Sequence, residues 1–349
     1  MTDIMRLAPA EAERFTTAVL EKAGLRASDA ATAARAIVEA DLAGVDTHGI
    51  IRLPMYVAWL GDGRIDPRAE IEVERTMPAV ALLDGRGAMG HLCMTRAAEI
   101  AADAARTYGI GWVGLRNSNH AGAIGIYAAR LAREGFISIC GAVSAINQVA
   151  PWGGSEPLMG TNPIAFAVPG EEEAPVVFDM ATTIASLGMI KKYAMEGRPM
   201  PEGWIVDREG RPMTDASRHA EGLLLPVGEH KGSGLALMIG LIAAVANGAD
   251  FGRGLGEGGR PVSVGQFVLA LDGRALAPGF REKVDEIVRD FGKSAPVAGG
   301  GPVRVPGVAR AEKEAERRIR GIPIPAPLMR ELALLADRSG VAHPAYAAG

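Results

Sequence analysis

Two histidines lie in turn-like sequences next to glycine, and both could transfer protons. His48 stands in the segment DTHG at 46–49, and His120 stands in NSNHAG at 117–122. A histidine in a loop can face a cleft, and the charge of its side chain changes near neutral pH. Either histidine alone could equally be a surface or capping residue. Together they are candidates for general acid–base catalysis.

Arg52 follows His48 by four residues, so both side chains project on one side if a helix begins near residue 49. A guanidinium can hold a carboxylate through two parallel hydrogen bonds while a nearby imidazole protonates a carbonyl oxygen. We therefore expect Arg52 to bind a substrate carboxylate. The alternative is an arginine that is merely exposed on a helix.

Two further segments suit an anionic ligand. The sequence HKG at 230–232 opens an apolar helix, and a lysine at a helix N-terminus favours a phosphate group. The sequence DMATT at 179–183 follows an apolar strand and could present backbone and hydroxyl groups to a ligand. The alternatives are a lysine that extends from a helix end into solvent, and a helix N-cap.

The segment GRGAMG at 85–90 matches the dinucleotide-binding fingerprint GxGxxG and lies between an expected strand and an expected helix. Asp84, directly before it, would face the pyrophosphate with a negative charge. The regular alternation of strands and helices of a doubly wound sheet also does not follow. We therefore interpret the segment as a tight turn into a helix.

Composition and motifs argue against several other classes of protein. The chain of 349 residues has a net charge of −4 and no basic block, which disfavours nucleic acid as a partner. No CxxC, HExxH or GxSxG motif indicates a metal site or a serine hydrolase. The longest apolar run, residues 234–246, is too short to span a membrane and predicts a buried helix. With two cysteines and no signal sequence, we expect a cytoplasmic protein.

Hydrophobic periodicity predicts a mixed α/β chain with a helical lobe built from one or both chain ends. The expected helices are 9–23, 29–43, 50–60, 91–108, 122–134, 231–246, 282–291, 309–318 and 329–339; the expected strands are 71–76, 79–84, 110–115, 137–143, 163–169, 174–180 and 267–272.

Several of these segments, in this order, resemble motifs of the type 2 malate/L-lactate dehydrogenase family. This family also includes ureidoglycolate and sulfolactate dehydrogenases, diketogulonate reductases and Δ1-piperideine-2-carboxylate reductases. The motifs are DLAGVDTHG at 41–49, NSNHAG at 117–122, APWGG at 150–154, GTNP at 160–163, DMATT at 179–183, PEGW at 201–204, HKG at 230–232 and VPG at 305–307. The resemblance covers nearly the whole chain.

The resemblance implies a non-Rossmann NAD(P)-binding fold, with a largely antiparallel sheet plus a helical domain, in a homodimer. We expect residues 1–75 and 300–349 to form the helical domain, and residues 76–299 to form the NAD(P)-binding and catalytic region. The implied reaction is hydride transfer between NAD or NADP and C2 of a small 2-oxo or 2-hydroxy acid. The substrate could instead be a cyclic imine 2-carboxylate, ureidoglycolate or sulfolactate. The implied partner is thus a small carboxylate, with neither a membrane nor a nucleic acid.

The resemblance also implies roles for individual residues. His48 and His120 would be the acid–base residues, and Arg52 would hold the carboxylate with Thr47 and Tyr56 nearby. The cofactor-contacting residues would be Ser144, Asp179, Met180, Ala181, Lys231, Gly232, Pro306 and Gly307. Thr47 stands where the family usually has serine, and Val308 stands where it usually has glutamate. The second departure leaves open what the last cofactor segment contacts.

Overall fold

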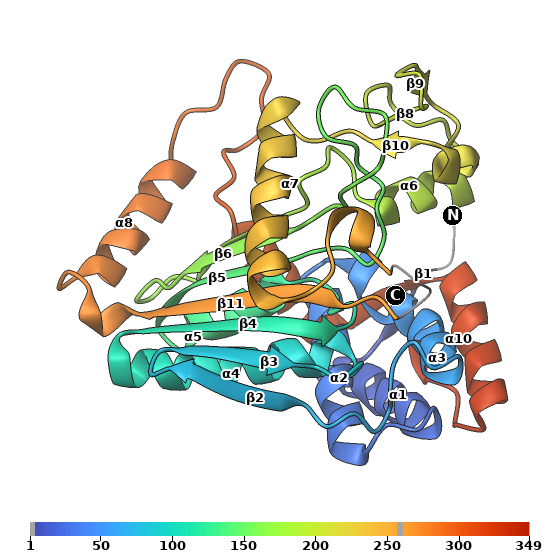
Figure 1. Cartoon of the computed structure of the whole chain (residues 1–349), viewed down its shortest axis with the longest axis horizontal. Helices are drawn as coiled ribbons and strands as arrows, with labels where there is room; N and C mark the ends of the chain where they lie inside the picture. The colour runs from blue at the N-terminus through green and yellow to red at the C-terminus, as the bar shows by residue number, and fades with distance from the viewer. Residues whose placement is uncertain (1–3, 257–260, 349) are drawn as a thin grey trace.

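A seven-stranded sheet forms the centre of the computed structural model, which describes residues 4–256 and 261–348 (Figure 1). In spatial order the strands are β2 (Glu72–Met77), β3 (Val80–Asp84), β4 (Ile110–Ser118), β11 (Val264–Asp272), β5 (Phe136–Ala142), β6 (Ile164–Val168) and β7 (Val176–Met180). Neighbouring strands of this sheet run antiparallel except β3 and β4, which are parallel. The prediction of a non-Rossmann fold with a largely antiparallel sheet is confirmed.

One face of the sheet is covered by α4 (Gly90–Tyr108) and α5 (Gly125–Arg133), which pack on β4, β11, β5 and β6. All the alanines of α4 are buried, and small side chains let the helix lie close to the strands. Residues 85–89 form the predicted turn into this helix. The face carries the larger part of the hydrophobic core.

The two chain ends meet beside the sheet. The strands β1 (Ile4–Leu7), β12 (Ile322–Pro325) and β13 (Tyr346–Ala348) form a three-stranded antiparallel sheet. They share one hydrophobic core with α1 (Pro9–Lys22), α2 (Ala27–Leu42), α3 (Leu53–Gly61) and α10 (Ala326–Ser339), and α9 (Val308–Arg320) packs against α2. The expected domain boundary at residue 75 falls inside β2, and the division of the chain into domains stays a prediction.

The helix expected at 231–246 is α7 (His230–Ala243), followed by a 3-10 turn at Val245–Asn247. It lies on the second face of the sheet, against β11 and β5. Its predicted burial is wrong for one side of the helix. The side chains of Leu237, Met238, Leu241 and Ile242 are exposed, as is that of Val245. An apolar face is therefore left open to solvent.

The remaining elements lie toward the edges of the molecule. They are α6 (Leu187–Met195), the small antiparallel sheet of β8 (Ile205–Val206), β9 (Pro212–Met213) and β10 (Leu223–Leu224), and α8 (Phe280–Gly292), which stands away from the body at the left of Figure 1. Within residues 4–256 and 261–348, no helix has the length and hydropathy needed to cross a membrane. The same residues contain no group of three or more His, Cys, Asp or Glu placed to hold a metal ion.

Candidate active site

A buried carboxylate holds the turn that carries His48 in place through a hydrogen bond to the backbone. Two short 3-10 turns, Asp46–His48 and Ile50–Arg52, connect α2 to α3. Asp41 at the end of α2 is 3% exposed, and its carboxylate accepts a hydrogen bond of 2.8 Å from the backbone N–H of Ile50. A Cβ atom on Gly49 would overlap this carboxylate, so the turn requires glycine there. The fold thus holds His48 in a defined position.

A second anchor comes from the C-terminal part of the chain. Arg317 of α9 donates to the backbone carbonyl of Asp41 and pairs with the carboxylate of Asp46. The side chain of Arg317 is buried, whereas that of Asp46 is exposed, so the ion pair lies at the surface and the bond to the carbonyl of Asp41 lies beneath it. The helix α9 therefore stabilises the loop that carries Thr47 and His48.

His120 lies in the loop between β4 and α5. Asn117 at the end of β4 has a φ of 51°, and Gly122 has a φ of 70°. Asparagine and glycine tolerate these left-handed conformations better than other residues do. The two residues let the chain turn sharply on either side of His120.

The structure brings five of the predicted residues together. The imidazole rings of His48 and His120 are stacked, with centroids 5.7 Å apart and an angle of 16° between the planes. The Tyr56 hydroxyl lies 2.8 Å from Nδ1 of His120, and Oγ1 of Thr47 lies 3.0 Å from Nδ1 of His48. Both histidines are partly exposed, whereas Tyr56 is buried behind them. The two rings can therefore meet a small ligand from the solvent side.

Arg52 lies beside the same rings. Its Nε donates to the backbone carbonyl of Thr47 at 2.7 Å, which orients the guanidinium. Burial raises the pKa of Tyr56, and the charge of Arg52 opposes this rise; the same charge adds to the lowering of the pKa values of His48 and His120 by burial. Among the described residues no carboxylate forms an ion pair with Arg52. The guanidinium can therefore bind an anionic ligand.

Burial and the nearby positive charge hold both histidines in their neutral form. Burial, followed by the charge of Arg52, lowers the pKa of His48 to about 4. Burial, followed by the charges of His48 and Arg52, lowers the pKa of His120 well below its ordinary value. Two stacked imidazolium rings would also repel each other. At neutral pH both rings are therefore neutral, and each has one nitrogen that can donate a hydrogen bond and one that can accept one.

Several of the predicted cofactor segments meet at one end of β5, β6 and β7. Ser144 follows β5, and its Oγ lies 3.0 Å from Oγ1 of Thr161. Thr182, directly after the segment 179–181, donates from its backbone N–H to the carbonyl of Thr161 at 2.9 Å. Asp179 accepts a hydrogen bond from the N–H of Gly125 at the start of α5. These contacts link the cofactor segments to the loop of His120.

The start of α7 adjoins this group. The N–H of Val227 donates to the carbonyl of Thr182, four residues before the exposed side chain of Lys231. Gly232 packs against the carbonyl of Val227, where a Cβ atom would overlap, so the fold itself requires glycine at this position. An exposed ammonium group at a helix N-terminus suits a phosphate.

Pro306 and Gly307 form the turn before α9 and lie against the start of β7. A Cβ on Gly307 would lie 2.7 Å from the carbonyl oxygen of Pro175 and from the backbone nitrogen of Val177, so the segment touches the opposite end of β7 from Asp179. Val308 is exposed at the start of α9. The structure does not bring this segment to Ser144 or Lys231.

The donor set fits an extended, anionic and hydroxyl-rich ligand such as NAD(P). The set includes the hydroxyl groups of Ser144 and Thr161, which contact each other. Hydrogen bonds through Thr182 and Val227 connect them to the start of α7, which adds its N-terminal N–H groups and the ammonium of Lys231. The hydrogen bond from Gly125 to Asp179 connects this group to the segment that follows His120.

Sequence reasoning did not select three residues that shape the site. Asp41 and Thr161 stand inside motifs that carried the family resemblance, so a signal for them was present. His91 follows the glycine-rich turn and packs behind Tyr56 with its ring centroid 5.0 Å away. It looked like one residue of an ordinary amphipathic helix, and only its tertiary contacts distinguish it.

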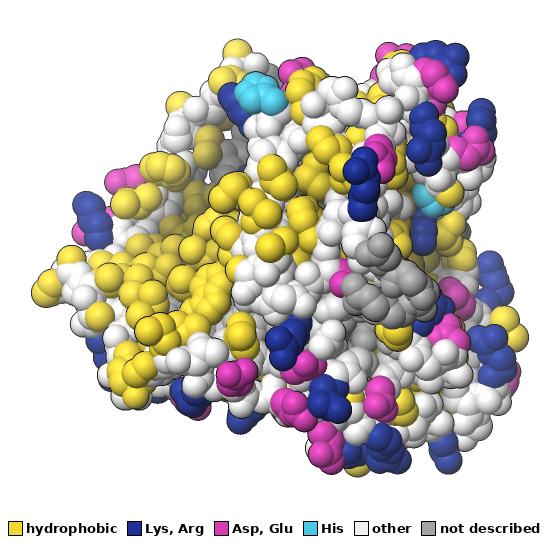
Figure 2. Space-filling view, viewed as in Figure 1, with side chains coloured by type: hydrophobic (Ala, Val, Ile, Leu, Met, Phe, Trp, Pro, Cys, Tyr) yellow, Lys and Arg dark blue, Asp and Glu magenta, His cyan; other side chains and the backbone are white. Residues whose placement is uncertain are grey.

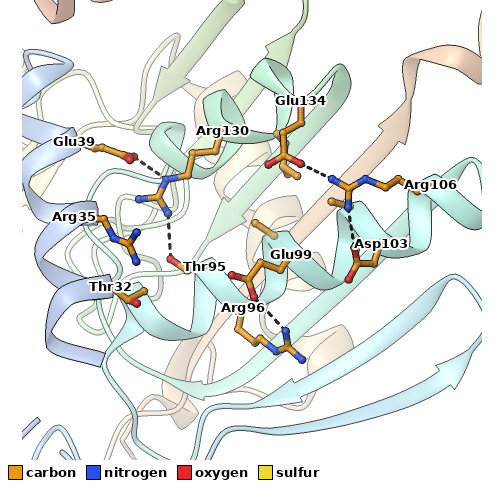
Figure 3. Close-up of a pocket in the computed structure, with 13 residues that line it drawn as sticks. Thr32, Arg35, Glu39, Thr95, Arg96, Glu99, Asp103, Arg106, Arg130 and Glu134 are labelled. Carbon is orange, nitrogen blue, oxygen red and sulfur yellow. Dashed lines mark hydrogen bonds and ion pairs between the residues drawn. The ribbon is translucent and has the colours of Figure 1, made fainter. Parts of the chain in front are cut away.

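A separate charged pocket of about 480 Å³ lies between α2, α4 and α5 (Figure 3). Its arginines are largely neutralised by carboxylates: Arg130 bonds to Glu39 at 2.7 Å, and Arg96 pairs with Glu99 at 3.1 Å. Neither histidine of the site lines this pocket. Because its charges cancel, it offers little attraction for an anionic substrate.

Comparisons with known proteins identify the family. A family model described as malate/L-lactate dehydrogenase matches residues 7–333. The (2R)-3-sulfolactate dehydrogenase (NADP(+)) of Chromohalobacter salexigens is 36% identical over 322 residues, which cover 91% of this chain and 93% of that protein.

Solved structures are similar over almost the entire chain. The malate dehydrogenase from Entamoeba histolytica superposes with a TM-score of 0.93 at 29% identity, and the match covers 98% of this chain and 100% of that one. The Δ1-piperideine-2-carboxylate reductase from Pseudomonas syringae has a TM-score of 0.84 at 29% identity, with 95% of this chain and 99% of that one covered. Both similarities include the helical part and the sheet.

Proposed function

Since the chain belongs to the malate/L-lactate dehydrogenase family, we propose that it transfers a hydride between NAD(P) and C2 of a small 2-oxo or 2-hydroxy acid, with His48 and His120 handling the proton. Family membership makes it an NAD(P)-dependent oxidoreductase. The observation that carries the assignment of residues is the stacked pair of neutral imidazoles beside the guanidinium of Arg52, which forms no ion pair with a carboxylate among the described residues.

In this proposal each side chain has one task. Arg52 pairs with the substrate carboxylate and so orients C2 toward the cofactor. Bound NAD(P) supplies the hydride in reduction and accepts it in oxidation. One histidine donates a proton to the new alkoxide oxygen in reduction, or takes the hydroxyl proton in oxidation. The negative substrate offsets the charge of Arg52, which raises the pKa of both histidines toward neutrality.

The cofactor would lie along the edge of the sheet. Ser144 and the segment Asp179–Ala181 would contact its central part, and Lys231 with the start of α7 would hold a phosphate. Pro306 and Gly307 would contact it only if it extends along β7. The exposed Val308 would then present an apolar surface to the cofactor, where a glutamate would present a charge.

The test is a panel of substrates. Oxidation of NADH and NADPH should be followed with 2-oxo monocarboxylates, 2-oxo dicarboxylates, a sulfonated 2-oxo acid and cyclic imine 2-carboxylates, and reverse assays should include ureidoglycolate. Turnover of one of these acids supports the proposal. Cofactor binding without turnover of any of them would indicate a binding protein that has kept the fold.

Reduction of a cyclic imine 2-carboxylate is the second candidate. It rests on the similarity to the Pseudomonas syringae Δ1-piperideine-2-carboxylate reductase. The chemistry differs little, because the carboxylate would still pair with Arg52 and the proton would go to nitrogen instead of oxygen. The ratio of kcat/KM for the imine and for the open-chain 2-oxo acid decides between the two.

The exposed apolar surface supports a homodimer. On α7 the exposed residues recur with helical spacing and form one continuous face (Leu237, Met238, Leu241, Ile242 and Val245). Next to it, Phe166 and Phe178 are exposed on the sheet, and Figure 2 shows hydrophobic side chains gathered over this region. A patch of this kind usually marks a protein interface. A second copy of the chain would bury it.

The cysteines support a reducing compartment. Cys93 and Cys140 are both buried and unpaired. Free thiols of this kind are typical of cytoplasmic proteins, in which disulfides are rare. We therefore infer a cytoplasmic location, which fractionation of the source cells with an antibody against the chain would test.

A further inference from the structure

The glycine-rich segment 85–90 supports the loop of His120. The N–H of Gly87 donates to the carbonyl of Asn117 at 2.8 Å, and Nδ2 of Asn119 donates back to the carbonyl of Gly87 at 3.0 Å. A Cβ atom on Gly90 would lie 2.7 Å from the carbonyl carbon of His120. The glycines therefore allow two backbone segments to come close together, and the start of α4 is held against the loop that carries His120.

The next residue, His91, is buried behind the site. Its side chain is fully buried, and neither ring nitrogen has a hydrogen-bond partner among the described residues. Its ring lies perpendicular to that of Tyr56, at 89° and 5.0 Å between centroids. A Cβ atom on Gly122 would lie 2.8 Å from its Nε2. His91 thus packs against Tyr56 and Gly122 at once.

These two neighbours of His91 are also the groups that meet Nδ1 of His120. The Tyr56 hydroxyl lies 2.8 Å from Nδ1, and the backbone N–H of Gly122 donates to it at 3.4 Å. A backbone N–H can only donate, so Nδ1 is an acceptor and the Tyr56 hydroxyl is the second donor. The proton of the neutral ring must then be on Nε2.

We propose that His91 is a positioning residue that holds Tyr56 and Gly122 in place and thereby keeps His120 in the Nε2–H tautomer. Since neither nitrogen of His91 makes a hydrogen bond within the described chain, its ring acts by shape. One part of this role rests on the proposed function: when substrate is bound, Nε2–H of His120 donates a hydrogen bond to the substrate oxygen. Proton transfer to and from that oxygen falls to His48, whose Nδ1 contacts only the hydroxyl of Thr47 among the described residues.

Three variants of the full-length protein test whether the shape of the His91 ring or its nitrogen atoms keep His120 in its tautomer. His91→Ala removes the ring, His91→Asn keeps a polar group without the ring, and His91→Phe keeps a ring without nitrogen. Ile100→Ala, further along α4 and also buried, is the control for general damage to the helix. The tautomer of His120 is read by NMR of protein labelled with ¹⁵N-histidine, with the signal assigned from its loss in His120→Gln.

We expect the Nε2–H tautomer of His120 in the wild type and in His91→Phe, and a mixture of tautomers in His91→Ala and His91→Asn. In the last two variants kcat should fall roughly tenfold or more, while the dissociation constant for NAD(P)H stays within twofold. Ile100→Ala should keep the wild-type tautomer.

An unchanged tautomer in both His91→Ala and His91→Asn would overturn the proposal. Loss of the tautomer in His91→Phe to the same extent as in His91→Ala would also overturn it, because the nitrogens would then be essential. The NMR readout needs no substrate. A protein that showed the expected tautomers but turned over none of the acids would refute the proposed function and leave the role of His91 standing.

Discussion

The Tyr56 hydroxyl lies 2.8 Å from Nδ1 of His120, although 64 positions of the chain separate the two residues. Tyr56 belongs to α3 in the helical part, and His120 belongs to the loop after β4 of the large sheet. The hydrogen bond therefore joins the two parts of the molecule at the site. The orientation of His120 depends on how these parts pack together.

Replacing either stacked histidine should impair the chemical step. We expect His48→Ala and His120→Ala to lower kcat by roughly 10²–10⁴-fold, the usual range for a lost acid–base group. Steady-state kinetics at saturating cofactor measure this loss. His343→Ala is the control, because that histidine is exposed and paired only with Asp337 among the described residues. Near-normal turnover in both site variants would mean that the stacked rings are not catalytic.

Arg52→Lys should weaken recognition of the substrate carboxylate. A lysine cannot offer two parallel donors, nor can it copy the bond from Nε to the carbonyl of Thr47. A hydrogen bond to a charged group contributes about 1.5–3 kcal/mol, so kcat/KM for the acid should fall roughly tenfold or more. The loss should be smaller for the matching amide, which carries no charge. Equal losses for acid and amide would show that Arg52 is structural.

Lys231→Ala should weaken cofactor binding. The ammonium group is exposed at the start of α7, and among the described residues it forms no ion pair. Loss of a phosphate contact of this type should raise the dissociation constant of NAD(P)H roughly tenfold. Titration of cofactor fluorescence measures it, with Lys22→Ala at the exposed end of α1 as the control. The contact is excluded if Lys231→Ala and Lys22→Ala bind the cofactor equally well.

The buried His91 should make the protein less stable in acid. Burial, followed by the charges of Arg130 and His48, lowers its pKa to about 3 from an ordinary value of 6.5. Below pH 6.5 the unfolded chain therefore binds a proton that the folded chain does not, and stability falls as the pH falls toward 3. For one group the slope is about 1.4 kcal/mol per pH unit.

Urea unfolding of the wild type and of His91→Phe at pH 7, 6 and 5 checks this slope. Phenylalanine does not titrate. Between pH 6 and pH 5 the free energy of unfolding should therefore fall by about 1 kcal/mol less in the variant than in the wild type. If the free energy of unfolding fell equally with pH in the two proteins, His91 would not remain neutral in the folded state.

Leu241→Glu should disrupt the proposed dimer. The residue lies in the middle of the exposed apolar face of α7, where a buried charge would be unpaired in the interface. Sedimentation equilibrium should give the dimer mass for the wild type and a monomer at the same concentration for the variant. Ile319→Glu, at an even more exposed position on α9, should leave the dimer intact. A monomeric wild type, or a dimeric Leu241→Glu, contradicts the assignment of this face.

Local features of the sequence were enough to find much of the candidate site. His48, His120 and Arg52 stand in short segments whose glycines and spacing of four residues are visible along the chain. The turn at 85–90 could also be predicted from local sequence. The negative charge of Asp84 would repel a pyrophosphate bound by this segment, which argued against a dinucleotide-binding loop. Strand and helix periodicity likewise reflects which side of each element is buried, so the mixed fold could be expected.

The tertiary structure alone decided which distant groups meet. The strand β11 lies between β4 and β5, and this order depends on long-range pairing that no local pattern specifies. The apolar run of α7 predicts burial without indicating whether the same chain or a second copy covers it. The tautomer of His120 depends on donors from α3 and from its own loop, both held by a ring from α4. Hydrogen bonds and packing act over a few ångströms in space, and only the folded chain brings these segments within that range.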